Sequence, residues 1–288
     1  MKKRDIEIVV AARDPHYVGD GFRVHNFIPS FPLLNMNRMD PFIFLDYNSK
    51  FYFPATSSPR GVELHPHRGF ETVTILYSGK VSHKDSEGNS GTIEEGEVQR
   101  MTAGSGVLHQ EFHEENWAKK GGDFHAIQLW VNLAKKDKMT KPKYQTVTKD
   151  KMEKYFLEND MGVLEIISGE YKDKKGYVKT FSPINLFNAK LKKGAKIDFS
   201  FKENYNTALL VVGGKIKVNG EDEVSESYFI LMQNDGQYFE IEALTDETIV
   251  FVMSGEPLNE PIYASGPFVM NTQEEVSQAY RDYHSGKF

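Results

Sequence analysis

The sequence lacks cysteine: none of its 288 residues is one. A chain without cysteine has no disulfide, no thiolate metal ligand, no iron–sulfur cluster and no cysteine nucleophile. A small secreted scaffold held together by disulfides is therefore excluded. At this length the chain can bury a hydrophobic core without such cross-links, either as two domains or as one large domain.

Long apolar runs are missing as well, since no segment approaches the ~20 consecutive apolar residues that a membrane-spanning helix needs. The chain starts with the basic run Met1-Lys2-Lys3-Arg4, which resembles the start of a signal peptide. However, the apolar run that follows, residues 8–12, is short and is flanked by Asp5, Glu7 and Arg13. We therefore predict a soluble, cytoplasmic protein that does not contact a membrane.

An excess of positive charge is also absent. The chain has 35 Lys and Arg against 41 Asp and Glu, which gives a net charge of −6. The two halves share this deficit, because residues 1–134 contain 14 basic and 17 acidic side chains and residues 135–288 contain 21 and 24. Phosphate-binding proteins usually carry a surplus of Lys and Arg. We therefore expect no direct binding to nucleic acid.

What the sequence does contain is many short runs rich in Val, Ile, Phe and Tyr, separated by Gly, Asn and Asp. Gly213-Gly214 and Asn219-Gly220 supply residues that accept positive φ in tight turns. Short strands joined by such turns favour sandwiches or barrels over βαβ units. The predicted fold class is therefore all-β. The clearest predicted strands are residues 71–77, 124–133, 162–167, 208–212, 215–218, 228–232, 238–243 and 248–253.

A change in composition after Leu133 divides the chain. Residues 135–143 contain five Lys and no apolar periodicity, so we predict a solvated linker there, and a nucleic-acid contact is the less favoured alternative. The N-terminal domain would then span residues 1–134. The C-terminal domain would span residues 135–288, including the linker.

One short helix is predicted near the C-terminus. The run Thr272-Gln-Glu-Glu275 matches a capping box. Val276, Ala279, Tyr280 and Tyr283 follow at helical spacing and form one apolar stripe, which indicates a packing role. A second short helix is predicted at residues 151–156.

Histidine placement is the most informative feature for function, because eight of the nine histidines lie before residue 126. His65 and His67 are two residues apart, as are His109 and Glu111, and side chains at this spacing share one face of a strand. If the two strands are neighbours, three imidazoles and one carboxylate surround one point. This donor set binds divalent transition metals and leaves open coordination positions. Unrelated surface histidines are the alternative, and the spacing alone does not decide between them.

Other polar residues could support this cluster. Glu71 shares the face of His65 and His67 if their strand continues, and His125 precedes a strand that we expect to face inward. We take both as candidates for contacting the metal ligands from outside. For His125, a core histidine with satisfied hydrogen bonds is the favoured alternative. His113 continues the alternation of His109, but a surface position is favoured for it. His83 is assigned only an ordinary loop role.

The chain from His65 to Glu111 resembles the pirin family, a branch of the cupin superfamily. The resemblance is carried by His65-Pro-His-Arg-Gly-Phe-Glu-Thr-Val-Thr74, His83-Lys-Asp-Ser-Glu-Gly88 and Met101-Thr-Ala-Gly-Ser-Gly-Val-Leu-His-Gln-Glu111. It implies a bicupin, in which two jelly-roll β-barrels pack face to face and only the N-terminal barrel binds metal. General cupins take a glutamate ligand from the first motif, here Glu71, which pirins do not usually count as a ligand.

The resemblance also implies the ligand set and the activity. The ligands would be His65, His67, His109 and Glu111. They would hold one divalent metal, with Fe(II) as the first choice and Ni, Cu, Zn or Mn as alternatives. The implied activity is a dioxygenase of the quercetin 2,3-dioxygenase type, which uses dioxygen to cleave flavonol-like substrates, with Glu111 as a catalytic base and apolar walls formed by residues such as Val73 and Ile75.

Two alternatives stay open. The first is a regulatory protein that binds a transcription factor or a metabolic enzyme, with the metal as a redox switch. The second is a cupin isomerase or small-molecule binder, which the altered second cupin motif disfavours. We expect a monomer in either case.

Overall fold

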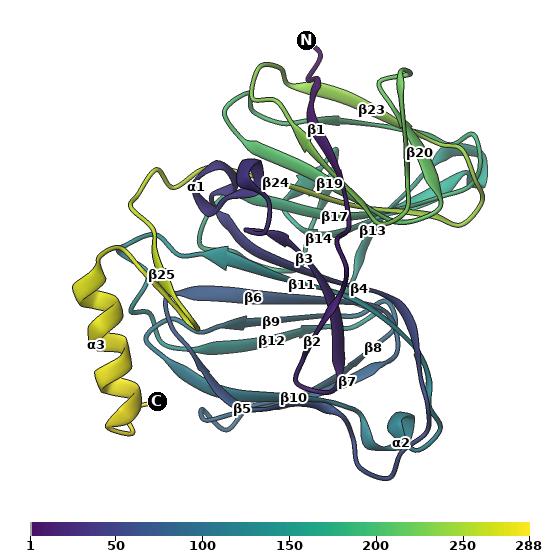
Figure 1. Cartoon of the computed structure of the whole chain (residues 1–288). Coiled ribbons are helices and arrows are strands. Elements are labelled where there is room, and N and C mark those ends of the chain that lie inside the picture. The colour runs from purple at the N-terminus through teal and green to yellow at the C-terminus, as the bar shows by residue number, and fades with distance from the viewer. Residues whose placement is uncertain (1) are drawn as a thin grey trace. The chain divides into compact units, whose positions relative to one another are not determined.

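The computed structural model describes residues 2–288 and is built almost entirely from β-strands (Figure 1). It divides into two compact units. The first unit comprises Asp14–Lys149 and Leu258–Phe288, and the second comprises Met1–Arg13 and Asp150–Pro257. These units differ from the predicted domains 1–134 and 135–288, because each terminal segment of the chain belongs with the opposite half.

The assignment of the N-terminal segment to the second unit has a simple structural cause. Strand β1 (Ile6–Ala11) pairs antiparallel with β22 (Tyr228–Met232), at the edge of a sheet in the second unit. Local sequence patterns do not reveal a partner more than 200 residues away, so the domain prediction missed it.

The first unit consists of two antiparallel sheets, as expected for a jelly roll. The larger sheet has the strand order β12-β9-β6-β11-β4-β3-β2, and the smaller has the order β5-β10-β7-β8. The strands are β2 (His16–Val18), β3 (Phe22–Ile28), β4 (Phe42–Phe53), β5 (Gly61–His67), β6 (Phe70–Ser78), β7 (Lys80–Asp85), β8 (Ser90–Glu94), β9 (Val98–Thr102), β10 (Val107–His113), β11 (Gly122–Asn132) and β12 (Lys143–Val147). The other elements of this unit are η1 (Pro32–Leu34), α1 (Met36–Met39), α2 (Glu115–Ala118), β25 (Tyr263–Ser265), β26 (Phe268–Met270) and α3 (Gln273–His284).

The second unit repeats this architecture with an apolar interior. Its sheets have the strand orders β1-β22-β19-β24-β17-β14-β13 and β18-β23-β20-β21. Phe199 stacks on Phe187 and Phe239 in the core between them. The further elements are β13 (Glu153–Phe156), η2 (Glu158–Asp160), β14 (Gly162–Ser168), β15 (Glu170–Tyr171), β16 (Lys174–Lys175), β17 (Ile184–Leu191), β18 (Lys196–Ser200), β19 (Asn206–Gly213), β20 (Lys215–Val218), β21 (Asp222–Ser225), β23 (Tyr238–Ala243) and β24 (Thr248–Gly255).

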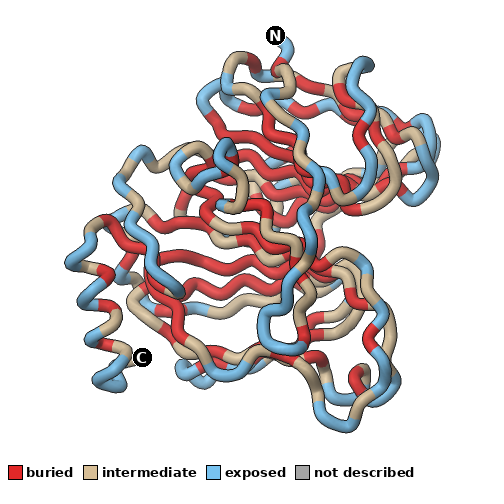
Figure 2. Tube along the Cα trace, viewed as in Figure 1, coloured by how far each residue is buried: buried red, intermediate tan, exposed pale blue. Residues whose placement is uncertain are grey.

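Burial follows the strands in each unit, while most connecting loops are exposed (Figure 2). Each of the eight predicted strands corresponds to an observed one, and the all-β fold class is confirmed. Asn219 and Gly220 both have positive φ, at the turn between β20 and β21.

The C-terminal helix is confirmed as α3. Thr272 accepts a hydrogen bond from the backbone N–H of Glu275, and the Glu275 carboxylate accepts one from the backbone N–H of Thr272. This is the predicted capping box, and Val276 and Ala279 are buried as the stripe requires. The predicted helix at residues 151–156 is wrong, because Glu153–Phe156 form strand β13, which pairs with β14.

The predicted linker is also wrong. Within residues 135–143, the Lys138 side chain is buried in the first unit, and Lys143 starts strand β12, which pairs with β9. The Lys138 ammonium donates to the backbone oxygens of Gly69 and Val269 (2.9 Å each) and to Asn132 Oδ1 (2.7 Å). Burial lowers the pKa of this lysine to about 8. All three donors have acceptors, which explains how a lysine is accommodated here.

Replacing Lys138 with methionine is expected to lower the free energy of unfolding by about 2–4 kcal/mol. The substitution leaves three buried acceptors without a donor, at roughly 1–3 kcal/mol each, and part of this loss is offset by removing a buried charge. Urea denaturation measures the difference. Lys136→Met is the matched control, because Lys136 is exposed on the same segment. Equal stability of the two variants would show that the Lys138 contacts add nothing.

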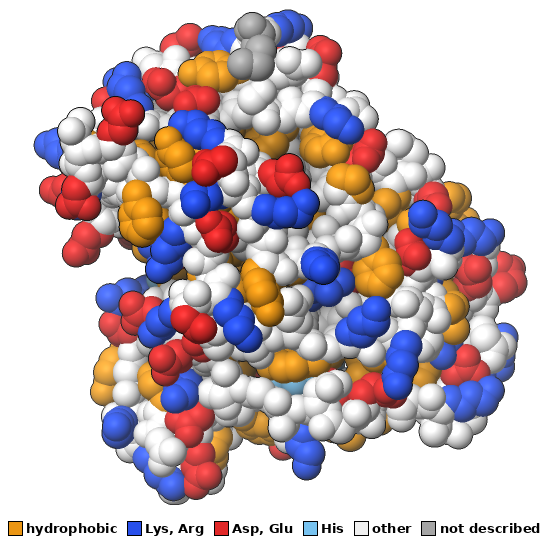
Figure 3. All heavy atoms as spheres, turned by 180° about the vertical axis from the view of Figure 1, so that it is seen from behind, with side chains coloured by type: hydrophobic (Ala, Val, Ile, Leu, Met, Phe, Trp, Pro, Cys, Tyr) orange, Lys and Arg blue, Asp and Glu red, His pale blue; other side chains and the backbone are white. Residues whose placement is uncertain are grey.

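No helix within residues 2–288 has both the length and the apolar character needed to cross a membrane. The surface carries charge of both signs. Lys and Arg side chains are intermixed with Asp and Glu across the face in Figure 3, where no large area of one sign is visible. Surface charge is therefore distributed as the even composition of the two halves suggests.

Candidate metal centre

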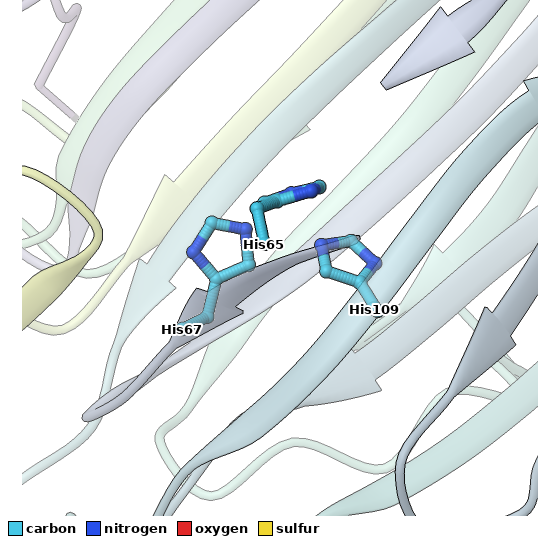
Figure 4. A group of neighbouring side chains, drawn as sticks. All are labelled: His65, His67 and His109. Atoms are coloured by element: carbon cyan, nitrogen blue, oxygen red, sulfur yellow. The ribbon is translucent and has the colours of Figure 1, made fainter. Parts of the chain in front are cut away.

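Three histidines meet where β5 and β10 run side by side in the smaller sheet of the first unit. The antiparallel register places His65 directly opposite His109, and His67 opposite Val107. The ring centre of His65 lies 4.2 Å from that of His109 and 4.8 Å from that of His67, and the rings of His67 and His109 are 4.9 Å apart. Figure 4 shows the three imidazoles gathered around one another. The predicted pairing of the two histidine-bearing strands is therefore observed.

The nitrogens of this cluster fit a metal ion. His65 Nδ1 donates to the backbone oxygen of Glu63 (2.8 Å), which leaves its Nε2 free to act as a ligand. His109 Nε2 is buried and has no hydrogen-bond partner among the described residues, and it points toward His65 and His67 (Figure 4). Each of the three histidines offers one ring nitrogen, and these nitrogens lie within 4.8 Å of one another, a spacing that fits one metal ion.

The electrostatics of the cluster favour the form of histidine that binds metal. Burial lowers the pKa of His67 well below its usual value, and the neighbouring His65 lowers it further. Burial likewise lowers the pKa of His109, together with the effects of His67, His65 and His83. Both imidazoles are therefore neutral at physiological pH, as ligation requires.

Glu111 lies two residues beyond His109 on the same buried face of β10. Its two carboxylate oxygens accept hydrogen bonds from separate amides, since Gln99 Nε2 donates to Oε1 (2.7 Å) and Gln128 Nε2 donates to Oε2 (2.9 Å). The possible ligand atoms form two overlapping groups, and within each group all of the atoms lie within 4.8 Å of one another. The groups are His65–His67–His109 and His83–His109–Glu111. The four predicted ligands are thus linked through His109, which belongs to both groups.

The residues that hold Glu111 belong to a polar row across the larger sheet. Gln128 on β11 lies opposite Asp46 on one side and Thr74 on the other, and Thr74 lies opposite Gln99. Directly opposed positions on neighbouring strands are therefore polar. Two of them, Gln99 and Gln128, supply the amides that fix the carboxylate of Glu111. The row spans six strands and consists of Asn26, Asp46, Gln128, Thr74, Gln99 and Thr146.

A pocket in the first unit opens onto this site. His65 and Glu111 line it together with Asp46 and Gln128, and its remaining wall is largely apolar. Burial raises the pKa of Asp46 to about 6, against a hydrogen bond from Asn26 that lowers it. The apolar lining residues are Val18, Phe22, Val24, Val62, Val81, Phe124, Ala126 and Ile127.

Glu71, Val73 and Ile75 do not lie where the sequence predicted. The chain turns at Gly69 (φ 91°) from β5 in the smaller sheet to β6 in the larger one, so the alternation from His65 does not carry over. Thr74 lines the pocket, and alternation then places these three residues on the opposite face of β6. There Glu71 accepts hydrogen bonds from Arg100 and from Thr102 Oγ1.

His125 has the satisfied hydrogen bond of its favoured interpretation, whereas the position of His113 differs from the prediction. His125 Nε2 lies 3.0 Å from the hydroxyl oxygen of Tyr47, so its described contact is with a tyrosine and not with a candidate ligand. His113 is buried, not on the surface, and donates from Nε2 to the backbone oxygen of Gly21 (2.8 Å). Burial lowers the pKa of His113 to about 4, which keeps it neutral in its aromatic surroundings.

His83 lies beside the cluster, whereas only an ordinary loop role was predicted for it. It lies on β7, the other neighbour of β10, where the register places it opposite Glu111, with Asp85 opposite His109. A signal was available, because His83 and Asp85 repeat the spacing of two seen in the other two pairs. Both groups of possible metal ligands found among residues 2–288 lie in the first unit.

Comparison with known proteins places these features in one family. The profile described as Pirin matches residues 21–131, which contain every candidate ligand. The profile described as Pirin C-terminal cupin domain matches residues 186–288. Together the two matches cover well over half of the chain.

Individual relatives agree with this result. A Pseudomonas aeruginosa protein, named provisionally as a quercetin 2,3-dioxygenase, is 42% identical over 273 residues, which cover 95% of this chain and 94% of that protein. Human pirin is 34% identical over 275 residues, covering 93% of this chain and 89% of its own length. A crystal structure titled quercetin 2,3-dioxygenase from Acinetobacter baumannii has a TM-score of 0.93 and 42% identity, and covers 100% of this chain and 99% of its own.

Proposed function

This chain belongs to the pirin family, and from that membership we propose that it is a metal-dependent dioxygenase that cleaves the heterocyclic ring of quercetin-type flavonols. The reaction incorporates both atoms of dioxygen and releases one ring carbon as carbon monoxide. The relatives that support this proposal are the two proteins named as quercetin 2,3-dioxygenases, each 42% identical to the chain over nearly its whole length.

In this proposal a single divalent metal is held by His65, His67, His109 and Glu111, with Fe(II) as the first choice. When bound, the metal supplies Lewis acidity that lowers the pKa of a substrate hydroxyl, and open positions for substrate oxygens. The supporting observations are the three histidine nitrogens within 4.8 Å of one another, the unpaired buried Nε2 of His109, and the group that His109 forms with Glu111. Imidazole and carboxylate ligands also suit Ni, Cu, Zn and Mn, so the donor set alone does not select iron.

Glu111 is the proposed general base. Its carboxylate lies beside the histidine cluster and lines the pocket, so it can accept the proton of a substrate hydroxyl that binds there. Gln99 and Gln128 each donate to one of its oxygens, and these bonds hold the carboxylate in place.

The pocket suits a flat aromatic substrate with a polar edge. Its apolar side chains can pack against aromatic rings, and its polar side chains include His65 and Glu111. Near the cluster, Trp130 stacks on Phe70 with ring centres 4.1 Å apart, and its ring centre lies 5.1 Å from that of His67. These rings shield one side of the histidine cluster.

One observation carries the proposal: three histidines offer ring nitrogens within 4.8 Å of one another, and Glu111, which forms a second such group with His109, lines a largely apolar pocket together with His65. The test is to load the purified protein with Fe(II) anaerobically, add quercetin and dioxygen, and follow the flavonol absorbance together with carbon monoxide release. We expect metal-dependent loss of absorbance with one carbon monoxide per flavonol. A metal-loaded protein without turnover would overturn the substrate assignment and leave the metal site standing.

A further inference from the structure

Strand β7, which pairs with β10 beside the histidine cluster, carries two further buried polar side chains. His83 and Asp85 share the site-facing side of this strand, and their side chains are 0% and 2% exposed. Neither residue has a role in the proposed reaction. A histidine and a carboxylate are seldom buried together without a structural or chemical reason.

We propose that Asp85 and His83 form a hydrogen-bonded relay that fixes the proton of His109 on Nδ1 and so presents the Nε2 lone pair of His109 to the metal. His83 and Asp85 are then positioning residues and not ligands. This inference rests on the proposed metal site.

The relay starts from a fixed carboxylate. Asp85 Oδ1 accepts hydrogen bonds from the backbone N–H groups of Glu87 (3.0 Å) and Asn89 (2.9 Å), in the turn between β7 and β8. The side-chain amide of Asn89 donates to both carboxylate oxygens, at 3.2 and 3.0 Å. The remaining contact of Oδ2 is with His83 Nε2, at 3.2 Å. The turn therefore sets the orientation of the carboxylate before any metal is bound.

The proton positions follow from this anchor. A carboxylate only accepts hydrogen bonds, so the proton between Asp85 and His83 lies on His83 Nε2. With this proton on Nε2, His83 presents Nδ1 as the acceptor in the proposed relay, and Nδ1 lies 3.4 Å from His109 Nδ1. His109 must donate across this distance, so its own lone pair is on Nε2. That nitrogen is the buried, unpaired one in the cluster with His65 and His67.

Tyr144 holds the ring of His83 in place. The two rings stack with centres 4.5 Å apart and planes 15° apart. The Tyr144 hydroxyl donates to Gln99 Oε1 (3.1 Å), and Gln99 in turn donates to Glu111. One tyrosine therefore braces both the relay to His109 and the amide that fixes Glu111.

His83 could instead be a ligand, since it forms a group with His109 and Glu111. The contacts of His83 argue against this, because its Nε2 is engaged by Asp85 and its Nδ1 lies 3.4 Å from His109 Nδ1, which leaves neither nitrogen for a metal. A carboxylate that supports a ligating histidine raises its basicity, and removing such a partner costs about 10–100-fold in metal affinity. In the proposed relay, the support from Asp85 reaches the ligand His109 through the additional imidazole of His83.

The test uses Asp85→Asn and His83→Phe in the full-length protein. Asparagine retains the acceptor at Oδ1 but donates toward His83 Nε2, which reverses both tautomers. Phenylalanine retains the stack on Tyr144 and removes the acceptor for His109. Affinity for Co(II) is measured by competition with a chelator, imidazole ligands are counted by X-ray absorption, and the Fe(III)/Fe(II) potential is measured by titration. Lys84→Gln is the control, because Lys84 is exposed between the two residues on the same strand.

We expect both variants to bind Co(II) about 10–100-fold more weakly, with an unchanged imidazole count. We also expect a higher Fe(III)/Fe(II) potential, since a less basic His109 stabilises Fe(III) less. Wild-type affinity and potential in both variants would overturn the relay. Loss of one imidazole in His83→Phe would also overturn it and make His83 a ligand. Failure of the wild-type protein to bind metal would instead overturn the proposed function, so the two failures are distinguishable. Asp85→Asn is nearly isosteric and keeps the test valid if His83→Phe does not fold.

Discussion

A His109→Ala variant is expected to bind no stoichiometric metal and to have no measurable dioxygenase activity. His109 is the residue shared by both groups of possible ligands, so its removal disrupts the site wherever the metal lies. Residues that only support a ligand already contribute about 10–100-fold to metal affinity. Loss of a ligand itself should therefore lower affinity by more than about 100-fold. Elemental analysis after gel filtration and chelator competition measure the effect.

His16→Ala is the control for this experiment, because His16 is an exposed histidine of the same unit. It should retain metal and activity. His65→Ala provides a second test. His65 is only partly buried, so its replacement disturbs the packing of the unit less than replacement of the buried His109. Retention of metal at wild-type affinity by both His109→Ala and His65→Ala would contradict the proposed centre.

A Glu111→Gln variant is expected to lower kcat by about 10²–10⁴-fold, the usual contribution of a general base. The amide has almost the shape of the carboxylate but accepts no proton from the substrate. It also presents an N–H group to one of two donors, Gln99 or Gln128, so one of these hydrogen bonds is lost. We expect a smaller change in KM than in kcat, because the pocket walls are unchanged.

The measurement is steady-state turnover at saturating Fe(II), with the metal content of each sample determined in parallel. Saturating metal separates loss of the base from weaker metal binding. Glu115→Gln serves as the control, because Glu115 is exposed on α2. If Glu111→Gln retained wild-type kcat at full metal occupancy, Glu111 would not be the base.

Local patterns in the sequence were sufficient to predict the strands and the C-terminal helix. Runs such as Tyr228–Met232 are observed as strands with the predicted bounds, because alternation and turn residues act over a few neighbours. The approach of His65 to His109 was also predictable, since each pair occupies one face of its strand. These features depend on short-range geometry.

The errors arise where the chain changes sheet or where a charge is buried. Glu71 was placed by extending the alternation of β5 through Gly69, where the chain in fact passes into another sheet. Lys138 belongs to a lysine-rich segment that resembles a solvated linker, yet it donates to the nearby Asn132 and to two acceptors distant in sequence, the backbone oxygens of Gly69 and Val269. Such long-range contacts leave no periodic signal in a single sequence.

The pairing of β1 with β22 has a consequence for synthesis on the ribosome. Residues 6–11 emerge early, but their partner strand emerges only after residue 228. At about 5–20 residues per second, this delay is roughly 10–40 s. During that time the nascent chain carries an unpaired strand that can associate with other chains. Slow translation or a shortage of chaperones should therefore reduce the yield of correctly assembled protein.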